Sequence, residues 1–356
     1  MKKLAIVIAA LPAATTLHAQ SNVALYGLVD AGVEVVNHAS ATGGSVTRLT
    51  SGGQNTSRWG LRGSEDLGGG LKALFQLESG ISVDTGANDT QLFRRQANVG
   101  LEGSFGRLIA GRSYTTAYDF ILPFDPMGYA PAYSWATAGN ATSAAASSAY
   151  GMTTAFDNLL KYQGTFGGFK LGASYGFGEV AGDSSAGRRY ALGMGYAAGP
   201  FSAALTGERV NAPMSTAPQS RTTAYHLGVG WQLNNAIALK GGARHYKQEP
   251  AGGGADLRAN TYWAGVNWQA TPALGVTAAL YFQDQRNVAT TEADPKMLVL
   301  RGKYALSKRT DLYAVTAHAR ARNGQPVGLT RDVSPQGVTG FSDTQTGVMV
   351  GVQHRF

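Results

Sequence analysis

The sequence predicts an all-β protein, a 16-stranded antiparallel transmembrane β-barrel with a long third loop folded into the pore. Three observations predict this fold: runs in which apolar and small or polar residues alternate, short turns at regular spacing, and an amino terminus typical of exported proteins. Alternation with a period of two indicates a strand with two different faces. No run of apolar residues approaches the roughly 20 that a spanning helix needs.

The amino-terminal stretch MKKLAIVIAALPAATTLHA is typical of a secretory signal peptide. Lys2 and Lys3 give a basic start, residues 4–11 are mostly apolar, and Ala19 is a small residue at the expected cleavage site. We therefore expect a signal peptide at 1–19 and a barrel at 20–356, which leaves 356 − 19 = 337 residues. An amphipathic first helix of the mature fold is the alternative.

The composition favours a membrane barrel over a soluble exported protein. Charged residues make up 15%, against ~25% in typical soluble domains, and the chain has 48 glycines, 16 tyrosines and no cysteine. The formal charge of +8 is accompanied by no nucleic-acid-binding motif, so we expect no nucleic-acid partner. Phosphate-binding and dinucleotide motifs are absent and the histidines lack ligand spacing, so we expect no cofactor, no metal and no enzyme activity.

Seven short turns divide the chain into hairpins. Because seven turns separate eight hairpins, the count is sixteen strands, with longer polar loops at the opposite end, which is the pattern of outer-membrane barrels. Closure satisfies the backbone groups that an open edge would leave unpaired in lipid. The last strand, ending at Phe356, is therefore expected to pair with a strand starting near Asn22. The turns lie at 66–70, 103–106, 166–169, 197–201, 233–236, 270–274 and 306–310.

The alternating runs carry aromatic residues at their ends. In YHLGVGWQL, for example, Tyr225 and Trp231 flank Leu227 and Val229 on one face. A soluble sandwich shares the alternation but does not need aromatic rings at both ends of its strands, whereas a membrane barrel places them at both interfaces. The aromatic ends, the turn spacing and the signal peptide together favour the membrane barrel.

One interval between turns is enlarged, and it contains the third loop, at about 115–155. A loop this long in a compact protein is usually either functional or disordered. A sixteen-stranded barrel encloses an aqueous channel, so the loop is expected to fold back and narrow it. An external flap is the alternative.

The position of charged residues along each strand predicts which of them face water. An arginine or lysine facing lipid at mid-bilayer costs about 2–4 kcal/mol. Parity accordingly places Arg58, Arg62, Glu78 and Arg94 inside. Strict parity points Arg95 and Arg112 outward, so either a β-bulge shifts them or they lie in a protein–protein contact, which we favour for Arg95.

Several segments resemble the general porins of β-proteobacteria, of the neisserial and burkholderial type: SNVALYGLVDAGVEVV, SRWGLRGSEDLGGGLKALFQLESG, LFRRQANVGLEGSFGRLIAGRSYT and the ending GVQHRF. The resemblance implies a homotrimer, a third loop folded into the pore, and passive diffusion of small hydrophilic solutes, often favouring anions. It also implies that the constriction includes Arg58, Glu78, Asp119 and the pair Arg94 and Arg95.

The expected function is an outer-membrane porin, a water-filled channel for ions and small hydrophilic solutes. Arg58, Arg62 and Arg94 would lower the barrier for anions, opposed by Glu78, Asp119 and Asp125. The preference is expected to be weak, because residues 115–156 contain no arginine or lysine. Expected partners are two further copies in a homotrimer, outer-membrane lipid and lipopolysaccharide, and the barrel-assembly machinery acting on Phe356. An outer-membrane barrel acting as an adhesin or an enzyme is the alternative.

Overall fold

The computed structural model describes residues 22–137, 151–212, 220–287, 291–329 and 340–356. The predicted signal peptide, 1–19, lies outside them. Within these ranges no helix is long and apolar enough to cross a membrane. The strands and helices are β1 (Asn22–Val36), β2 (Val46–Ser51), β3 (Arg58–Gly68), β4 (Leu71–Gly80), β5 (Gln96–Gly103), β6 (Gly106–Tyr114), α1 (Thr116–Ile121), η1 (Leu122–Phe124), β7 (Ala155–Phe166), β8 (Phe169–Gly176), β9 (Arg189–Ala198), β10 (Phe201–Asn211), β11 (Arg221–Gln232), β12 (Ile237–Glu249), β13 (Leu257–Gln269), β14 (Leu274–Arg286), β15 (Lys296–Ala305), β16 (Thr310–Arg320) and β17 (Thr344–Arg355).

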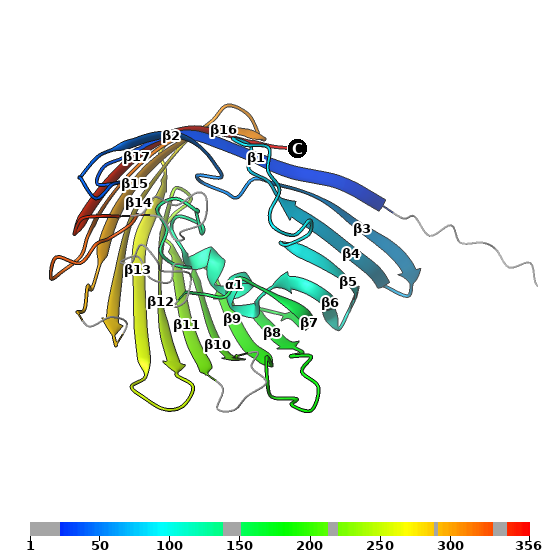
Figure 1. Ribbon diagram of the computed structural model, residues 1–356. Coiled ribbons are helices and arrows are strands. Elements are labelled where there is room, and N and C mark those ends of the chain that lie inside the picture. The colour runs from blue at the N-terminus through cyan, green and yellow to red at the C-terminus, as the bar shows by residue number, and fades with distance from the viewer. Residues whose placement is uncertain (1–21, 138–150, 213–219, 288–290, 330–339) are drawn as a thin grey trace, which may run out of the picture.

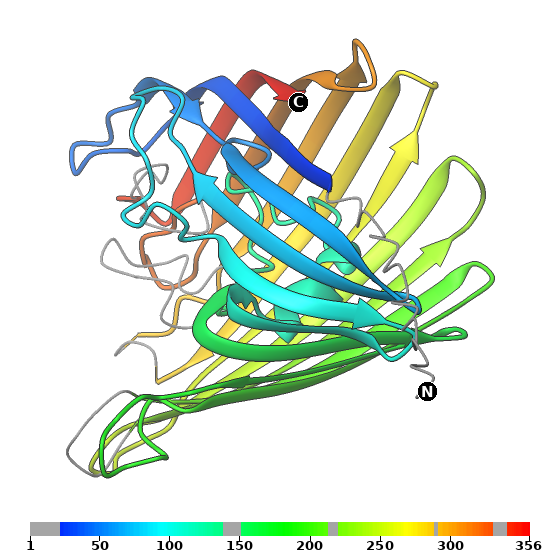
Figure 2. The same ribbon diagram turned by 90° about the vertical axis from the view of Figure 1, so that its right-hand side faces the viewer.

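All strands join one antiparallel sheet that closes on itself, as Figures 1 and 2 show. The sheet contains 17 strand segments, but β2 and β3 both pair with β1, β2 over Ala31–Val36 and β3 over Asn22–Leu28. They therefore occupy one position in the wall, which gives 17 − 1 = 16 strand positions. The predicted sixteen-stranded antiparallel barrel is confirmed. All seven predicted short turns lie between hydrogen-bonded neighbours, from β3–β4 to β15–β16.

The break between β2 and β3 is held by the side chain of Asp30. Its Oδ2 atom accepts from the backbone amides of Gln54 at 3.1 Å and Asn55 at 2.9 Å. Tyr313, from β16, donates to Oδ1 of the same carboxylate at 2.7 Å. Asp30 is fully buried, so these donors replace the water it would otherwise need.

Closure joins the first strand to the last. β1 and β17 are in antiparallel register from Leu28 opposite Arg355 to Val36 opposite Gly347. Beyond that ladder, Gly27 and Phe356 exchange both backbone hydrogen bonds at 3.1 Å. This confirms the predicted pairing of the carboxy-terminal strand, although it meets β1 from residue 27 onward rather than at Asn22.

The two faces of the wall differ as the alternation predicts. Along β17, Val348, Val350 and Val352 are 51%, 54% and 42% exposed, whereas the intervening Met349 is 1% exposed. The terminal Phe356 is on the outward face and is 44% exposed. Aromatic residues near strand ends, such as Tyr225 and Trp231 of β11, are also exposed on that face, as the predicted interfacial girdles require.

Residues 115–137, which follow β6, pack against the inward face of the wall. Figure 1 shows α1 inside the ring of strands, and α1 contacts β8, β9, β10 and β11. The Trp263 indole nitrogen donates to the Phe124 carbonyl at 3.0 Å, and that of Trp135 donates to the Leu329 carbonyl at 3.1 Å. The predicted third-loop boundaries, about 115–155, include residues 138–150, which lie outside the described residues.

Glycine makes room on the inward wall for this segment. A Cβ atom at Gly172 would collide with the ring of Phe120, and one at Gly228 would collide with the ring of Phe124. Part of the high glycine content thus follows from the close approach of an aromatic segment to the strands. Larger residues at these positions would displace α1 and η1.

We expect deletion of Phe356 to reduce barrel insertion more than the conductance of channels that do insert. The deletion removes both Gly27–Phe356 hydrogen bonds and an outward aromatic residue at the barrel seam, but no inward residue. The measurement is the yield of heat-modifiable, folded protein in outer membranes, followed by single-channel recording. Phe341→Ala, another exposed aromatic residue outside the strands, is the control. Normal yield with altered conductance would contradict the prediction.

Candidate pore-lining charge sites

A cluster around Glu78 forms on the inward face where β1, β3 and β4 meet. Arg95 Nε lies 2.8 Å from Glu78 Oε1, and Arg58 Nε lies 3.7 Å from Glu78 Oε2. Tyr26 donates to Oε2 at 2.9 Å and Tyr114 to Oε1 at 3.0 Å. We call these five residues the Glu78 cluster. The carboxylate is 5% exposed in its side chain and is satisfied by two cations and two hydroxyls, which offset its desolvation.

The Glu78 cluster is connected to α1 by stacked tyrosines. The Tyr114 and Tyr118 rings stack with centroids 4.4 Å apart and an interplanar angle of 15°. Thr115, which lies between these two tyrosines in the sequence, caps α1, because its hydroxyl accepts from the Tyr118 amide at 3.0 Å. The position of α1 is therefore coupled to the strands that carry Glu78.

Asp119 of α1 faces a second group of wall residues. Lys161 Nζ donates to Asp119 Oδ2 at 2.8 Å, and the Gln163 amide donates to the same atom at 2.7 Å. Lys170 lies over the ring of Phe120, with Nζ 4.5 Å from the centroid. These contacts fix α1 to β7 and β8 and neutralise the Asp119 charge with Lys161.

Asp125 organises the turn that follows η1. It is fully buried, and its carboxylate accepts from the amides of Met127 at 3.2 Å and Tyr129 at 2.6 Å. Two hydroxyl groups also donate to this carboxylate, that of Ser134 at 2.8 Å and that of Tyr281, from β14, at 2.6 Å. With four donors around it, the carboxylate is enclosed between the third-loop segment and the wall.

Tyr133 attaches the same segment to β1. Its hydroxyl donates to Glu34 Oε1 at 2.8 Å. Burial, and then the neighbouring Glu34 carboxylate, raise the pKa of Tyr133 well above its usual range, so the hydroxyl keeps its proton and remains a donor. Residues 115–137 are thus held to the wall at several points around the ring.

Several inward cations form no ion pair in the described parts of the chain: Arg62, Lys170, Lys240 and Arg301. Arg62 instead stacks over the Tyr26 ring at 4.8 Å. Arg301 donates to the side chains of Gln54 at 2.9 Å and Thr277 at 3.0 Å. Asp119 acts electrostatically on Lys170, and Asp125 acts on Lys240 and Arg301, so the positive charge near the third-loop segment is only partly offset.

The structure brings only some of the sequence-predicted residues together. Arg58 and Glu78 are in direct contact, and Arg62 lies next to them on β3, over Tyr26. Asp119 belongs to a separate ion pair, and Asp125 is enclosed. Arg94 is in none of these groups.

The outward orientation predicted for Arg95 is wrong. Parity holds only inside a strand, and β5 begins at Gln96, so Arg94 and Arg95 lie in the preceding turn. Arg95 turns inward to Glu78 and Tyr114, whereas Arg94 is half-exposed with Nη1 4.0 Å from Asp89 Oδ1.

For Arg112, the structure shows a β-bulge, one of the two explanations for its position. The pairing of β6 with β7 shifts between Gly111 and Ser113, and Gly111 adopts a φ of +123°. The Arg112 side chain pairs with Asp157 at 2.5 Å and donates to the Arg94 carbonyl. Neither arginine thus faces lipid as an unpaired charge.

Sequence reasoning missed the tyrosines that complete the Glu78 cluster. Tyr26 has inward parity on β1, and this parity is the sequence signal that could have identified it. The sequence interpretation assigned aromatic residues only to the outward girdles. Tyr114 ends β6, where the bulge changes the phase. Among the described residues no group of histidines and acids could hold a metal ion.

The chain matches the family model described as Gram-negative porin over residues 4–324. It is 33% identical to outer membrane porin protein 32 of Delftia acidovorans, with 100% of each chain covered. It is 32% identical to an outer membrane porin protein of Bordetella pertussis, with 95% of each covered. It is also similar to a solved structure described as an anion-selective porin from Comamonas acidovorans, with a TM-score of 0.81, 30% identity, and 95% of this chain and 100% of the other covered.

We expect Asp125→Asn to loosen the turn at 126–134 without unfolding the barrel. The amide side chain lacks the charge that strengthens the hydrogen bonds from Met127, Tyr129, Ser134 and Tyr281, and each such bond contributes roughly 1.5–3 kcal/mol. Amide hydrogen exchange in 126–134, followed by mass spectrometry, should be about tenfold faster or more, since about 1.4 kcal/mol corresponds to tenfold. Asp89→Asn, with the same change in another loop, is the control. Unchanged exchange would show that Asp125 does not hold this turn.

Proposed function

The chain belongs to the Gram-negative porin family, and we propose that its channel weakly favours anions, with the opening lined by the Glu78 cluster, Arg62, Lys170 and the Asp119–Lys161 pair. The protein is an outer-membrane porin: a closed β-barrel through which ions and small hydrophilic solutes diffuse passively. Passive transport requires no covalent chemistry. Fixed charges at the narrowest part of the lumen then set the barrier for each ion.

The charge balance of the inward wall is the observation that carries the proposal. Two acids near α1 are neutralised, Glu78 by Arg95 and Arg58, and Asp119 by Lys161, whereas the enclosed Asp125 has four uncharged donors. Four inward cations, Arg62, Lys170, Lys240 and Arg301, form no ion pair in the residues that the structure describes, and the single charge of Asp125 offsets them only in part. The remaining positive potential would lower the barrier for anions, and the paired acids keep the preference weak.

The third-loop segment supplies the narrowing in this proposal. Residues 115–137 are attached to inward side chains of β1, β7, β13 and β14, so they take up part of the lumen. A sixteen-stranded barrel would otherwise enclose a wider aqueous channel. The relative from Comamonas acidovorans that is described as anion-selective supports the same direction of preference.

The alternative functions, adhesin and barrel enzyme, are less well supported. The family and its porin relatives suggest a channel without enzymatic activity.

We further propose that the channel assembles as a homotrimer that lies among outer-membrane lipids and lipopolysaccharide, and that the barrel-assembly machinery recognises Phe356. A band of trimer size in unheated gels, and of monomer size after boiling, is the expected result. A monomer-sized unheated band would contradict the trimer.

We expect a salt gradient across a planar bilayer to give a reversal potential of the sign of an anion-preferring channel. The double variant Arg62→Gln/Lys170→Gln should lower the anion-to-cation permeability ratio by about twofold to fivefold, because one unit charge a few ångströms away contributes about 1 kcal/mol in water. Lys308→Gln/Arg309→Gln, in the exposed β15–β16 turn, removes two charges outside the lumen and is the control. A cation-preferring wild-type channel would overturn the proposal.

Substitutions of the neighbouring residues Arg95 and Arg94 test whether the Glu78 cluster contributes to ion preference. We expect Arg95→Gln to shift the reversal potential toward cations, because Glu78 then keeps only Arg58, at 3.7 Å. Arg94→Gln makes the same change in net charge one residue away, outside the Glu78 cluster, and should have a smaller effect. Both variants are measured by single-channel recording in the same salt gradient. If Arg94→Gln had the larger effect, our placement of the constriction would be wrong.

A further inference from the structure

A row of side chains on the outward face crosses four strands in direct register. Tyr262 of β13 is opposite Phe282 of β14, Phe282 is opposite Lys296 of β15, and Lys296 is opposite Arg320 of β16. The Tyr262 and Phe282 rings stack with an interplanar angle of 16°. In a membrane barrel, outward aromatic residues mark the interface between membrane and water. Lys296 and Arg320 therefore lie beside the aromatic band at the end of the barrel that carries the long loops.

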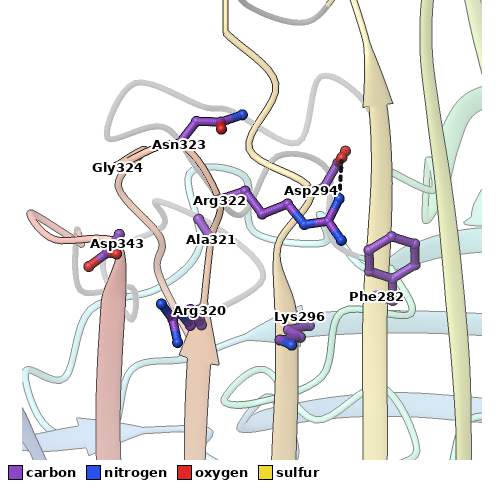
Figure 3. Close-up of a pocket in the computed structure, with 9 residues that line it drawn as sticks. All are labelled: Phe282, Asp294, Lys296, Arg320, Ala321, Arg322, Asn323, Gly324 and Asp343. Carbon is purple, nitrogen blue, oxygen red and sulfur yellow. Dashed lines mark ion pairs between the residues drawn. The ribbon is translucent and has the colours of Figure 1, made fainter.

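These cations border a cavity of about 550 Å³, which Figure 3 shows. Lys296 and Arg320 line it from the strand ends, and Arg322 extends across it toward Asp294 and Phe282. The volume is within the range of about 300–1,000 Å³ that is usual for ligand pockets. We call this cavity with its lining the rim recess.

The charges of the rim recess are only partly compensated. Arg322 pairs with Asp294 at 3.7 Å, and Asp294 also lies 3.9 Å from Arg286. Lys296 and Arg320 have no ion-pair or hydrogen-bond partner for their side chains in the part of the chain that the structure describes. Counting Asp343 as well, the lining has three cations and two acids, a net charge of 3 − 2 = +1. Two unpartnered cations at one rim are suited to an anionic group.

The wall next to the rim recess is apolar in the direction of mid-membrane. Leu298, two residues along β15 from Lys296, is 46% exposed, and Leu280, its neighbour on β14, is 59% exposed. A molecule bound to this surface would thus contact cations at one end and, toward mid-membrane, aliphatic side chains at the other. That combination matches a lipid with an anionic headgroup better than a soluble anion.

We propose that the rim recess binds the phosphorylated sugar headgroup of an outer-leaflet glycolipid, with phosphate on Lys296, Arg320 and Arg322 and acyl chains along Leu280 and Leu298. Guanidinium and ammonium groups form charge-assisted hydrogen bonds with phosphate. The site is on the outward face and is separate from ion passage through the lumen. It goes beyond the proposed channel activity, and it rests on the proposal that the porin lies among lipopolysaccharide, for which it names a binding site.

The test uses the full-length porin, folded and purified in detergent, with a diphosphorylated acylated glucosamine disaccharide as probe. Binding is measured by native mass spectrometry. Lys296→Gln/Arg320→Gln should raise the Kd of the probe about tenfold or more, because two charge-assisted contacts are lost. The matched control, Lys308→Gln/Arg309→Gln, removes the same charge from the short turn between β15 and β16, at the other end of the barrel, and should leave the Kd unchanged. The dephosphorylated disaccharide should bind the wild type about as weakly as the probe binds the double variant.

Three outcomes would overturn the proposal. The first is an equal Kd for wild type and the Lys296→Gln/Arg320→Gln variant. The second is full competition by inorganic phosphate at probe concentration, which would indicate a small-anion site. The third is loss of the oligomer in unheated gels of this variant, which would assign the surface to a second copy of the chain. Single-channel conductance should stay at the wild-type value, so failure of this proposal is distinguishable from failure of the channel function.

Discussion

The structure depends on one constraint: in hydrocarbon every backbone amide and carbonyl must find its partner within the protein. A sheet meets this constraint only by closing, and here closure depends on the ladder between β1 and β17 and on the terminal pair Gly27–Phe356. Closure in turn creates an interior that lipid cannot reach. Charged side chains that would be costly on the outside can therefore collect on the inner face, and a loop with polar backbone can rest there.

The inner face is an organised polar surface that positions the third-loop segment. Glu78, Asp119 and Asp125 each accept from several donors, but each carboxylate stabilises a different part of the structure. Glu78 joins wall strands to one another, Asp119 fixes α1 to β7, and Asp125 shapes the loop itself. Asp125 is fully buried, whereas Glu78 and Asp119 belong to the opening proposed above. The side chains near α1 combine paired acids with cations that form no ion pair, and the ion preference proposed above rests on this combination.

Much of the fold could be predicted because period-two alternation and turn spacing are local properties. The same rule predicted that Arg58 and Glu78 face inward. It could not place Arg95, because orientation in a turn depends on the chain's path and not on parity. It could not show that Asp125 is enclosed, since one of its donors, Tyr281, is 156 residues away. The break between β2 and β3 also depends on a distant residue, Asp30, whose carboxylate takes the place of ladder partners.

The glycines opposite Phe120 and Phe124 have a consequence for how such channels can diverge. Because Gly172 and Gly228 leave the space that these rings fill, loop and wall are complementary surfaces encoded far apart in the chain. A loop transplanted alone from a relative with a differently contoured wall would leave voids or clash. Exchange of permeation properties between family members is therefore expected to require loop and facing strand positions to be inherited together, as one recombination block.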